Sequence, residues 1–152
     1  MKKFEFTGET KTISLFFRTA TLHRIRAVAE FGLVKIGDLG GWIEKEENLS
    51  HEGKAWVWGD AKVCGNAEVF SASHVLVIGA IGSRDDFTTF FRDKDNEITV
   101  KCGCFLGKID KFLEKVTQTH GDSKYALVYR AAVEVARLQI DLLGEAPKDA
   151  DE

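Results

Sequence analysis

A six-residue repeat constrains this sequence more than any other feature. Each unit contains an alanine and a valine two positions apart, followed by glycine and then Asp or Asn. The repeated positions are Ala55, Ala61 and Ala67, then Val57, Val63 and Val69, with Gly59-Asp60 and Gly65-Asn66 between them. A fourth unit, Ser73-His74-Val75, keeps the phase with serine in the small-residue position. Repetition at a fixed period restricts the architecture before any secondary-structure propensity is considered.

Each unit predicts a short strand followed by a tight corner. The alanine and the valine share one face of the strand and point inward, while glycine with Asn or Asp tolerates the left-handed backbone of the corner. The pattern resembles the hexapeptide repeat of left-handed parallel β-helices, in which three units form one triangular coil. Because residues 55–75 provide little more than one coil, the flanking segments are expected to cap, cover or extend it.

The outward positions of the repeat are unusually aromatic. They are Trp56, Trp58, Lys62, Cys64, Glu68, Phe70 and His74. Outward positions on a free coil are usually polar, so the three aromatic residues predict a covering layer, formed by this chain, by a second subunit or by a ligand. Since one coil buries little apolar area, we also expect a homo-oligomer that completes the core.

Strands are expected before the repeat. Apolar residues at period two indicate strands within 4–17, with a turn at 7–10, and another strand at 21–28. The glycine-rich stretch 32–41 is expected to be a loop, and the charged stretch 45–48 is expected to be exposed. No Gly-x-x-x-x-Gly-Lys-Ser/Thr motif follows a strand, which argues against a phosphate-binding loop of that type.

A loop at 79–84, a hairpin and two helices are predicted after the repeat. Alternation at 87–92 and 98–105 around a polar turn indicates antiparallel strands. Apolar residues then recur at helical spacing in 107–120 and 124–143, separated by glycine. The stripe on the second helix contains Ala126, Tyr129, Val133, Ala136 and Ile140. Such a seam suits packing on another helix.

The predicted fold class is therefore α+β. A β-rich N-terminal segment and a short left-handed β-helix-like coil are followed by a β-hairpin and two C-terminal helices. We expect residues 1–82 to contain the β-rich segment and the coil, and residues 83–143 to pack with them as one compact unit. The small, acidic tail at 144–152 is expected to be disordered.

Composition argues against several classes of function. The net charge of −3 gives no basic footprint for non-specific nucleic-acid binding. No apolar run approaches the length of about 18 residues that a membrane span needs, and the first residues lack the apolar core of a signal peptide, so a cytoplasmic location is expected.

Cysteine usage argues against a metal site and a disulfide. Cys64, Cys102 and Cys104 make an odd count, and the second and third are expected on one face of a strand as reduced, half-buried thiols. Neither these cysteines nor the scattered histidines supply a second pair of metal ligands. No metal and no cofactor are expected.

Two blocks of sequence flank the repeat. The first contains Leu22-His23-Arg24-Ile25-Arg26-Ala27, then Gly37-Asp38-Leu39-Gly40-Gly41-Trp42-Ile43-Glu44 and Asn48-Leu49-Ser50. The second contains Ile81-Gly82-Ser83-Arg84, then Cys102-Gly103-Cys104-Phe105-Leu106-Gly107 and Thr119-His120-Gly121-Asp122-Ser123-Lys124-Tyr125-Ala126. Together the blocks resemble a family of small phage and prophage proteins that carry hexapeptide repeats and mostly lack an assigned function. The resemblance implies a phage protein acting in the host cytoplasm and does not specify an activity.

The blocks also contain the candidate ligand-binding residues, which are cationic, aromatic or hydroxyl-bearing. These candidates are Arg24, Arg26, Trp42, Arg84, Thr88, His120, Lys124 and Tyr125. Backbone N–H groups of the loop before Arg84 can hold an anion together with its guanidinium, and the second helix begins where an anion is favoured. Each residue also has an ordinary structural interpretation, such as a surface ion pair or a helix cap, so the hypothesis rests on their co-occurrence.

Three functions fit these features. The leading hypothesis is a non-enzymatic protein that sequesters a small anionic, nucleotide-type signalling ligand to counter host defence. The second is a protein-interaction module that inhibits a host protein through the aromatic face of the repeat. The third is a degenerate acyltransferase, because hexapeptide coils also resemble enzymes that use acyl-coenzyme A and a catalytic histidine. Only His51 and His74 lie near the coil, and the coil is short for such enzymes, so we expect no catalysis.

Overall fold

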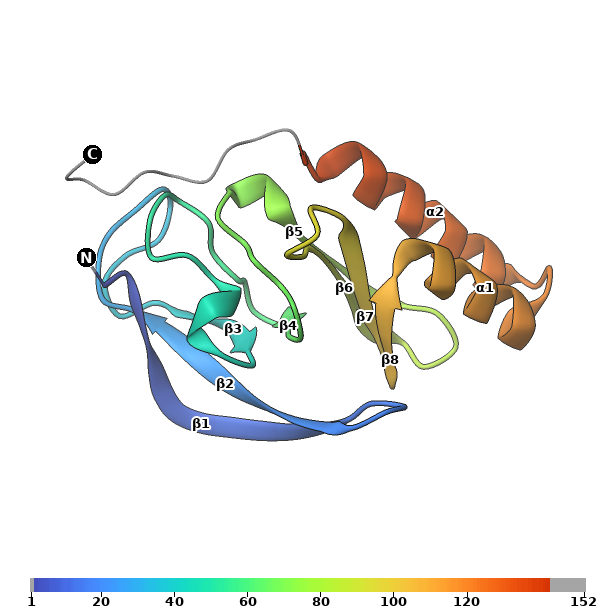
Figure 1. Ribbon diagram of the computed structural model, residues 1–152, viewed down its shortest axis with the longest axis horizontal. Coiled ribbons are helices and arrows are strands. Elements are labelled where there is room, and N and C mark those ends of the chain that lie inside the picture. Colours follow the sequence, from blue (N-terminus) through green and yellow to red (C-terminus); the bar gives the residue numbers. More distant parts are fainter. Residues whose placement is uncertain (1, 143–152) are drawn as a thin grey trace.

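Two four-stranded sheets and two helices make up the fold, seen in a computed structural model that describes residues 2–142 (Figure 1). The first sheet has the order β1 (Phe4–Ser14), β2 (Thr19–Ala27), β3 (Leu39–Ile43) and β4 (Lys62–Val63). The second has the order β5 (Val75–Ile81), β6 (Asp86–Arg92), β7 (Ile98–Cys102) and β8 (Phe105–Lys108), followed by α1 (Ile109–His120) and α2 (Lys124–Gln139). Short 3₁₀ helices lie at Glu46–Asn48 and Ala72–His74. The fold is α+β as predicted, and the tail predicted at 144–152 lies outside the described residues.

β1 and β2 form a long antiparallel hairpin. The turn predicted at 7–10 is wrong, because β1 continues through this stretch and its register with β2 shifts between Phe6 and Thr10. Gly8, with φ of +95°, absorbs the irregularity as a bulge. The chain reverses later, where the backbone N–H of Leu15 donates to the carbonyl of Arg18. The bulge therefore lengthens the hairpin.

The repeat pairs in parallel with the segment before it. Trp42 pairs with Lys62, Ile43 with Val63 and Leu49 with Val69, so the partners in each pair are separated by 20 residues (62 − 42, 63 − 43 and 69 − 49). All six repeated alanines and valines are at most 1% exposed, as the inward-facing pattern predicts. Of the repeat, only Lys62–Val63 forms a regular strand before β5, and a left-handed β-helix stays a prediction.

The chain itself covers most of the outward face of the repeat. Trp56, Cys64 and His74, predicted to point outward, are buried. Gly40 permits this for Trp56, because a Cβ on Gly40 would lie 2.7 Å from the Trp56 ring, and Phe31 packs edge-on to the same indole. Phe70 packs on His74, whereas Trp58 remains 52% exposed. The covering layer is thus largely internal.

The second sheet departs from the prediction at two turns. β5 extends through Ile81, so the predicted loop at 79–84 starts later than expected, around Gly82. The strand predicted at 98–105 is broken into β7 and β8, because Gly103 has φ of +56°, which suits the first central residue of a type II′ hairpin turn. Cys102 and Cys104 therefore do not share one strand face as predicted.

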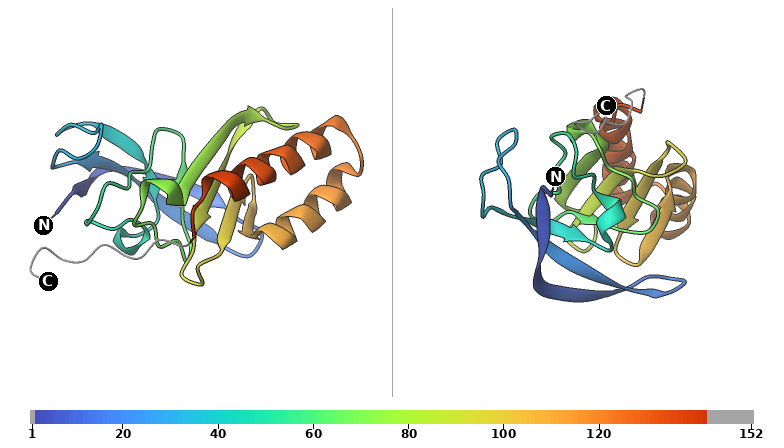
Figure 2. Two further views of the ribbon diagram at one scale, coloured as in Figure 1. Left: turned by 90° about the horizontal axis from the view of Figure 1, so that it is seen from above. Right: turned by 60° about the vertical axis from the view of Figure 1, so that its left-hand side comes forward.

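The helices pack on one side of the second sheet as their apolar stripes predict (Figure 2). Phe112 and Val116 of α1, and all five predicted stripe residues of the second helix, are buried in one core with Phe90 and Val100. The neighbouring residue Phe91 points to the opposite face of β6 and joins the core of the repeat. Two adjacent phenylalanines thus anchor β6 in both cores.

The turn between β6 and β7 pairs with the last unit of the repeat. The N–H of Glu68 donates to the Arg92 carbonyl, and the N–H of Lys94 donates to the Asn66 carbonyl. Since β2 pairs with β3 on the other side, the coil is flanked within its own chain. The physical reason for expecting a homo-oligomer is therefore weaker, and the oligomer itself stays a prediction. Between residues 2 and 142, no helix is long and apolar enough to cross a membrane.

Candidate functional site

A cavity of about 130 Å³ lies where the second sheet, both helices and the tip of the β1–β2 hairpin meet. The hairpin tip reaches this place because the N–H of Phe16 donates to the carbonyl of Cys104 over 3.0 Å. Figure 1 shows the tip approaching β8 from the other sheet. Phe16 therefore contributes to the wall of a cavity that otherwise belongs to the C-terminal half of the chain.

Three polar side chains line one part of the cavity. Thr88 is 1% exposed, and its Oγ1 donates to the Sγ of Cys102 over 3.5 Å. Tyr129 lies beside Cys102, and burial, with a smaller contribution from the neighbouring Cys102 sulfur, raises the pKa of Tyr129 to about 12. The two hydroxyl groups and the thiol come from β6, α2 and β7, so only the folded chain brings them together.

The rim of the cavity carries cationic and aromatic groups. The ammonium of Lys115 lies 4.9 Å from the centre of the Phe16 ring. The guanidinium of Arg84 lies beside Gly103, where a Cβ would be only 2.7 Å from Nη1. Among residues 2–142, neither cation has an ion pair with a carboxylate. His120 adds an imidazole, whose ring stacks on Tyr129 at a centroid distance of 5.7 Å.

The predicted ligand-binding residues separate into two groups. Arg84, Thr88 and His120 line the cavity, and the ring of Tyr125 lies 5.8 Å from that of His120. Lys124 is exposed at the start of α2 and does not line the cavity.

The other group lies on the first sheet. Arg24 forms an ion pair with Glu9, and Arg26 forms one with Glu5. The Trp42 ring is buried beneath the ammonium of Lys11 and the guanidinium of Arg24. These contacts match the ordinary interpretation of Arg24 and Arg26 as paired surface cations, and they place this group away from the cavity.

Most residues that line the cavity were not among the candidates, and they include Phe16, Cys102, Lys115 and Tyr129. Cys102 and Tyr129 were interpreted as strand and helix-packing residues, because each sits in an apolar alternation. Phe16 and Lys115 gave no local signal. The glycines offered the one usable clue, since Gly82 and Gly103 mark places where Tyr129 and Arg84 approach the backbone closely.

Neither histidine near the coil lines this cavity. His74 is 1% exposed, and its Nδ1 accepts a hydrogen bond from the Phe70 N–H. His51 accepts one from the Lys3 N–H and stacks on Phe4. Burial lowers the pKa of both imidazoles. Their ring nitrogens and faces thus have structural roles.

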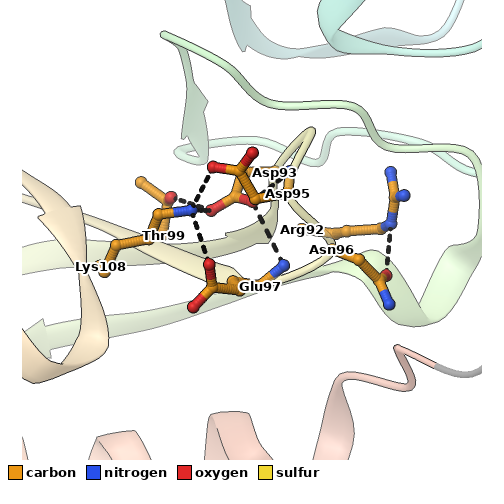
Figure 3. Close-up of polar contacts among 7 residues, drawn as sticks. All are labelled: Arg92, Asp93, Asp95, Asn96, Glu97, Thr99 and Lys108. Carbon is orange, nitrogen blue, oxygen red and sulfur yellow. Dashed lines mark hydrogen bonds and ion pairs between the residues drawn. The ribbon is translucent and has the colours of Figure 1, made fainter.

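A second polar cluster surrounds Lys108 at the turn between β6 and β7 (Figure 3). The ammonium lies 2.8 Å from Asp93, 2.9 Å from Asp95 and 3.4 Å from Glu97. Lys108 therefore offsets the repulsion among these carboxylates, which favours a structural role. Within the described part of the chain, no group of three or more His, Cys, Asp or Glu side chains could hold a metal ion.

Comparison with known proteins gives one distant similarity. No protein-family model matches the sequence. The chain is 29% identical over 84 residues to the uncharacterized acetyltransferase YdcK of Escherichia coli (strain K12). The match covers 48% of this chain and 26% of that protein, so it spans about a quarter of the relative's length. This similarity is weak and partial, and it adds no support for a phage origin.

Proposed function

We propose that the protein binds a small anionic ligand in the cavity and releases it unchanged. The supporting observation is the rim, where Arg84 and Lys115 lack carboxylate partners among the described residues. Guanidinium and ammonium groups bind phosphate and carboxylate through charge-assisted hydrogen bonds. Asp86 is the only carboxylate among the described lining residues, so the cationic groups dominate the rim.

The proposed ligand also has a flat or apolar part. Phe16, Phe105 and Phe112 line the cavity beside the cations, and binding pockets commonly combine apolar walls with a few polar groups that fix orientation. A nucleotide-type ligand has both parts. Its sequestration against host defence belongs to this proposal and is supported by the sequence resemblance alone.

Titration calorimetry with cyclic nucleotides and ADP-ribose derivatives tests the proposal. We expect one of them to bind and to be recovered intact by chromatography. Arg84→Gln should raise its Kd at least about tenfold, the effect of losing one charge-assisted hydrogen bond. Arg137→Gln is the matched control, because Arg137 is paired with Glu134 and lies outside the cavity. Absence of binding by the whole panel, or equal losses in both variants, would refute the proposal.

Acyl transfer is the second candidate, favoured by the similarity to an acetyltransferase. Since His51 and His74 are buried or engaged elsewhere, any such chemistry here would use groups of the cavity. Release of free thiol from acetyl-coenzyme A, followed with a thiol reagent, measures this activity. We expect His74→Gln to retain it and His120→Gln to lower it. A protein that releases no thiol with any acceptor offered would be no transferase.

The aromatic face that the protein-interaction alternative requires is mostly covered in the structure. Trp56 is buried, and Phe70 is partly covered by His74 and by the guanidinium of Arg92. Of the three outward aromatic residues, only Trp58 is largely accessible. We therefore give this alternative no further weight.

A further inference from the structure

Cys102 differs from the other two cysteines in its surroundings. Both Cys102 and Cys104 line the cavity and are half-buried, but the Cys102 sulfur also accepts a hydrogen bond from the Thr88 hydroxyl and lies beside Tyr129. Cys64 is fully buried, and burial raises its pKa to about 12. No hydrogen bond reaches the Cys104 sulfur from the part of the chain that the structure describes. Cys102 is thus the thiol that combines access with polar support.

The glycines around Cys102 indicate that this environment is built by the fold. A Cβ on Gly82 would lie 1.9 Å from the Tyr129 hydroxyl oxygen, and a Cβ on Gly103 would lie 2.7 Å from Arg84 Nη1. Both positions also have positive φ. Glycine at these two places therefore lets a hydroxyl and a guanidinium approach the walls next to the thiol.

We propose that Cys102 is a nucleophile that accepts an acyl group from a thioester bound in the cavity. The proposal rests on the acyl-transfer candidate and assigns its acceptor atom. Arg84 and Lys115 would bind the anionic carrier of the thioester at the rim, because phosphate groups pair with such cations. The small acyl end would reach the thiol beside Thr88 and Tyr129.

The reaction is an exchange of one thioester for another. The Cys102 sulfur attacks the carbonyl carbon, so a new C–S bond forms while the bond between the carbonyl carbon and the carrier sulfur breaks. The carrier leaves as a thiol with the proton that Cys102 gives up, and no oxidant or reductant is consumed. The hydroxyls of Thr88 and Tyr129 beside the sulfur would donate to the carbonyl oxygen as negative charge develops on it.

Mass spectrometry of the intact full chain after incubation with acetyl-coenzyme A tests this assignment. We expect one added acetyl group, mapped to Cys102 and removed by neutral hydroxylamine, as a thioester would be. Cys102→Ala should abolish it, while the control Cys104→Ser should retain it. Thr88→Val should slow acetylation about tenfold, the effect of one hydrogen bond, and Thr88→Ser should restore the rate.

Binding of free coenzyme A, measured by calorimetry, separates the two proposals. If coenzyme A binds and no acetyl group is transferred, the nucleophile assignment is wrong while anion binding stands. If acetyl maps to Cys104, or to a lysine as an amide that hydroxylamine does not remove, the assignment is also wrong. If neither binding nor acetylation occurs, the thioester donor is excluded together with the acyl-transfer candidate.

Discussion

The hydroxyl oxygen of Tyr129 occupies the space in which a side chain on Gly82 would begin. A Cβ built on Gly82 would lie 1.9 Å from that oxygen, far inside any van der Waals contact. The loop between β5 and β6 therefore packs directly against α2 where the Tyr129 hydroxyl meets Gly82. This fit holds Tyr129 beside Cys102 in the cavity.

Gly82→Ala should destabilise the protein more than Gly121→Ala. Both glycines have positive φ, so alanine costs on the order of 1–3 kcal/mol of backbone strain at either position. Only Gly82 adds a steric clash, since nothing lies within 4 Å of a Cβ on Gly121. This overpacking should lower the free energy of unfolding by about a further 1–3 kcal/mol. Urea unfolding measures the difference, and equal losses in the two variants would contradict the packing argument.

Asp93→Asn should lower the free energy of unfolding by about 3 kcal/mol at neutral pH, as breaking a buried ion pair does. The Asp93 side chain is 1% exposed and accepts hydrogen bonds from Thr99 and Lys108 and from the backbone N–H groups of Asp95 and Glu97. Glu97→Gln removes a charge from the same cluster at an exposed position, so it should cost less than about 1 kcal/mol. Chemical denaturation compares the two, and a larger loss in Glu97→Gln would be inconsistent with the geometry.

The contribution of Asp93 should also depend on acid. Burial alone would raise its pKa, but the hydrogen bonds from Lys108, Thr99 and the backbone outweigh it and leave the pKa lowered. A lowered pKa in the folded state gives stability that is present above the unfolded value of about 3.9. That stability is lost as pH falls through the folded pKa. The difference between wild type and Asp93→Asn should therefore shrink below about pH 4, and a pH-independent difference would exclude this account.

Sequence periodicity predicted the buried positions of the repeat and the packed face of the second helix. The spacing of Ala55 and Val57 and their repeats predicted burial, and the stripe containing Ala126 and Tyr129 predicted the packed face of the second helix. The turn at Gly103 was missed because the alternation from Ile98 to Cys104 continues unbroken through it. A glycine inside such a run is compatible with a strand or with a hairpin turn.

Long-range contacts explain why the candidate site was predicted only in part. Arg84, Thr88 and His120 line the same cavity, and each lies beside a loop, strand or helix end that the sequence pattern marks. Arg24 was grouped with them because its pairing with Glu9 across the β1–β2 hairpin depends on a register that the bulge sets. Phe16 meets Cys104 across 88 residues (104 − 16), and no pattern in either segment indicates that contact.

Asn48 should tolerate substitution poorly although it lies in a charged stretch that was predicted to be exposed. The side chain is fully buried, with Oδ1 accepting from the N–H groups of Glu44 and Lys45 and Nδ2 donating to the carbonyls of Gly65 and Ala67. Asn48→Asp replaces the donor with an acceptor facing two carbonyls, which should cost about 3 kcal/mol.

Asn66→Asp is the matched control for that substitution, because Asn66 is an exposed asparagine in the repeat next to Asn48. Its effect on unfolding should stay within about 0.5 kcal/mol, as is usual at surface positions. Thermal and urea unfolding of both variants provide the comparison. Similar losses in the two would show that the hydrogen bonds of Asn48 contribute little.

Cys64 should make the protein sensitive to alkali. The thiol is buried among Leu22, Trp42 and Leu106, and burial, assisted by the charge of Glu44, raises its pKa to about 12. The unfolded thiol loses its proton near pH 8.5, so the folded state binds more protons between these values. Stability from this group is therefore fully present below about pH 8.5 and is lost as pH rises toward the folded pKa, at up to about 1.4 kcal/mol per pH unit.

Cys64→Val removes the titrating group while keeping an apolar side chain of similar size, so its stability should match wild type within about 1 kcal/mol at pH 7. Lys3, whose pKa burial lowers to about 8, acts with the opposite sign in both proteins and cancels in the difference. Urea unfolding under reducing conditions at about pH 7, 8.5 and 10 measures that difference. These pH values lie below, at and above the pKa of the unfolded thiol. We expect the stability of the valine variant to rise relative to wild type only at the two higher pH values. Parallel pH profiles would mean that Cys64 is not held protonated by its surroundings.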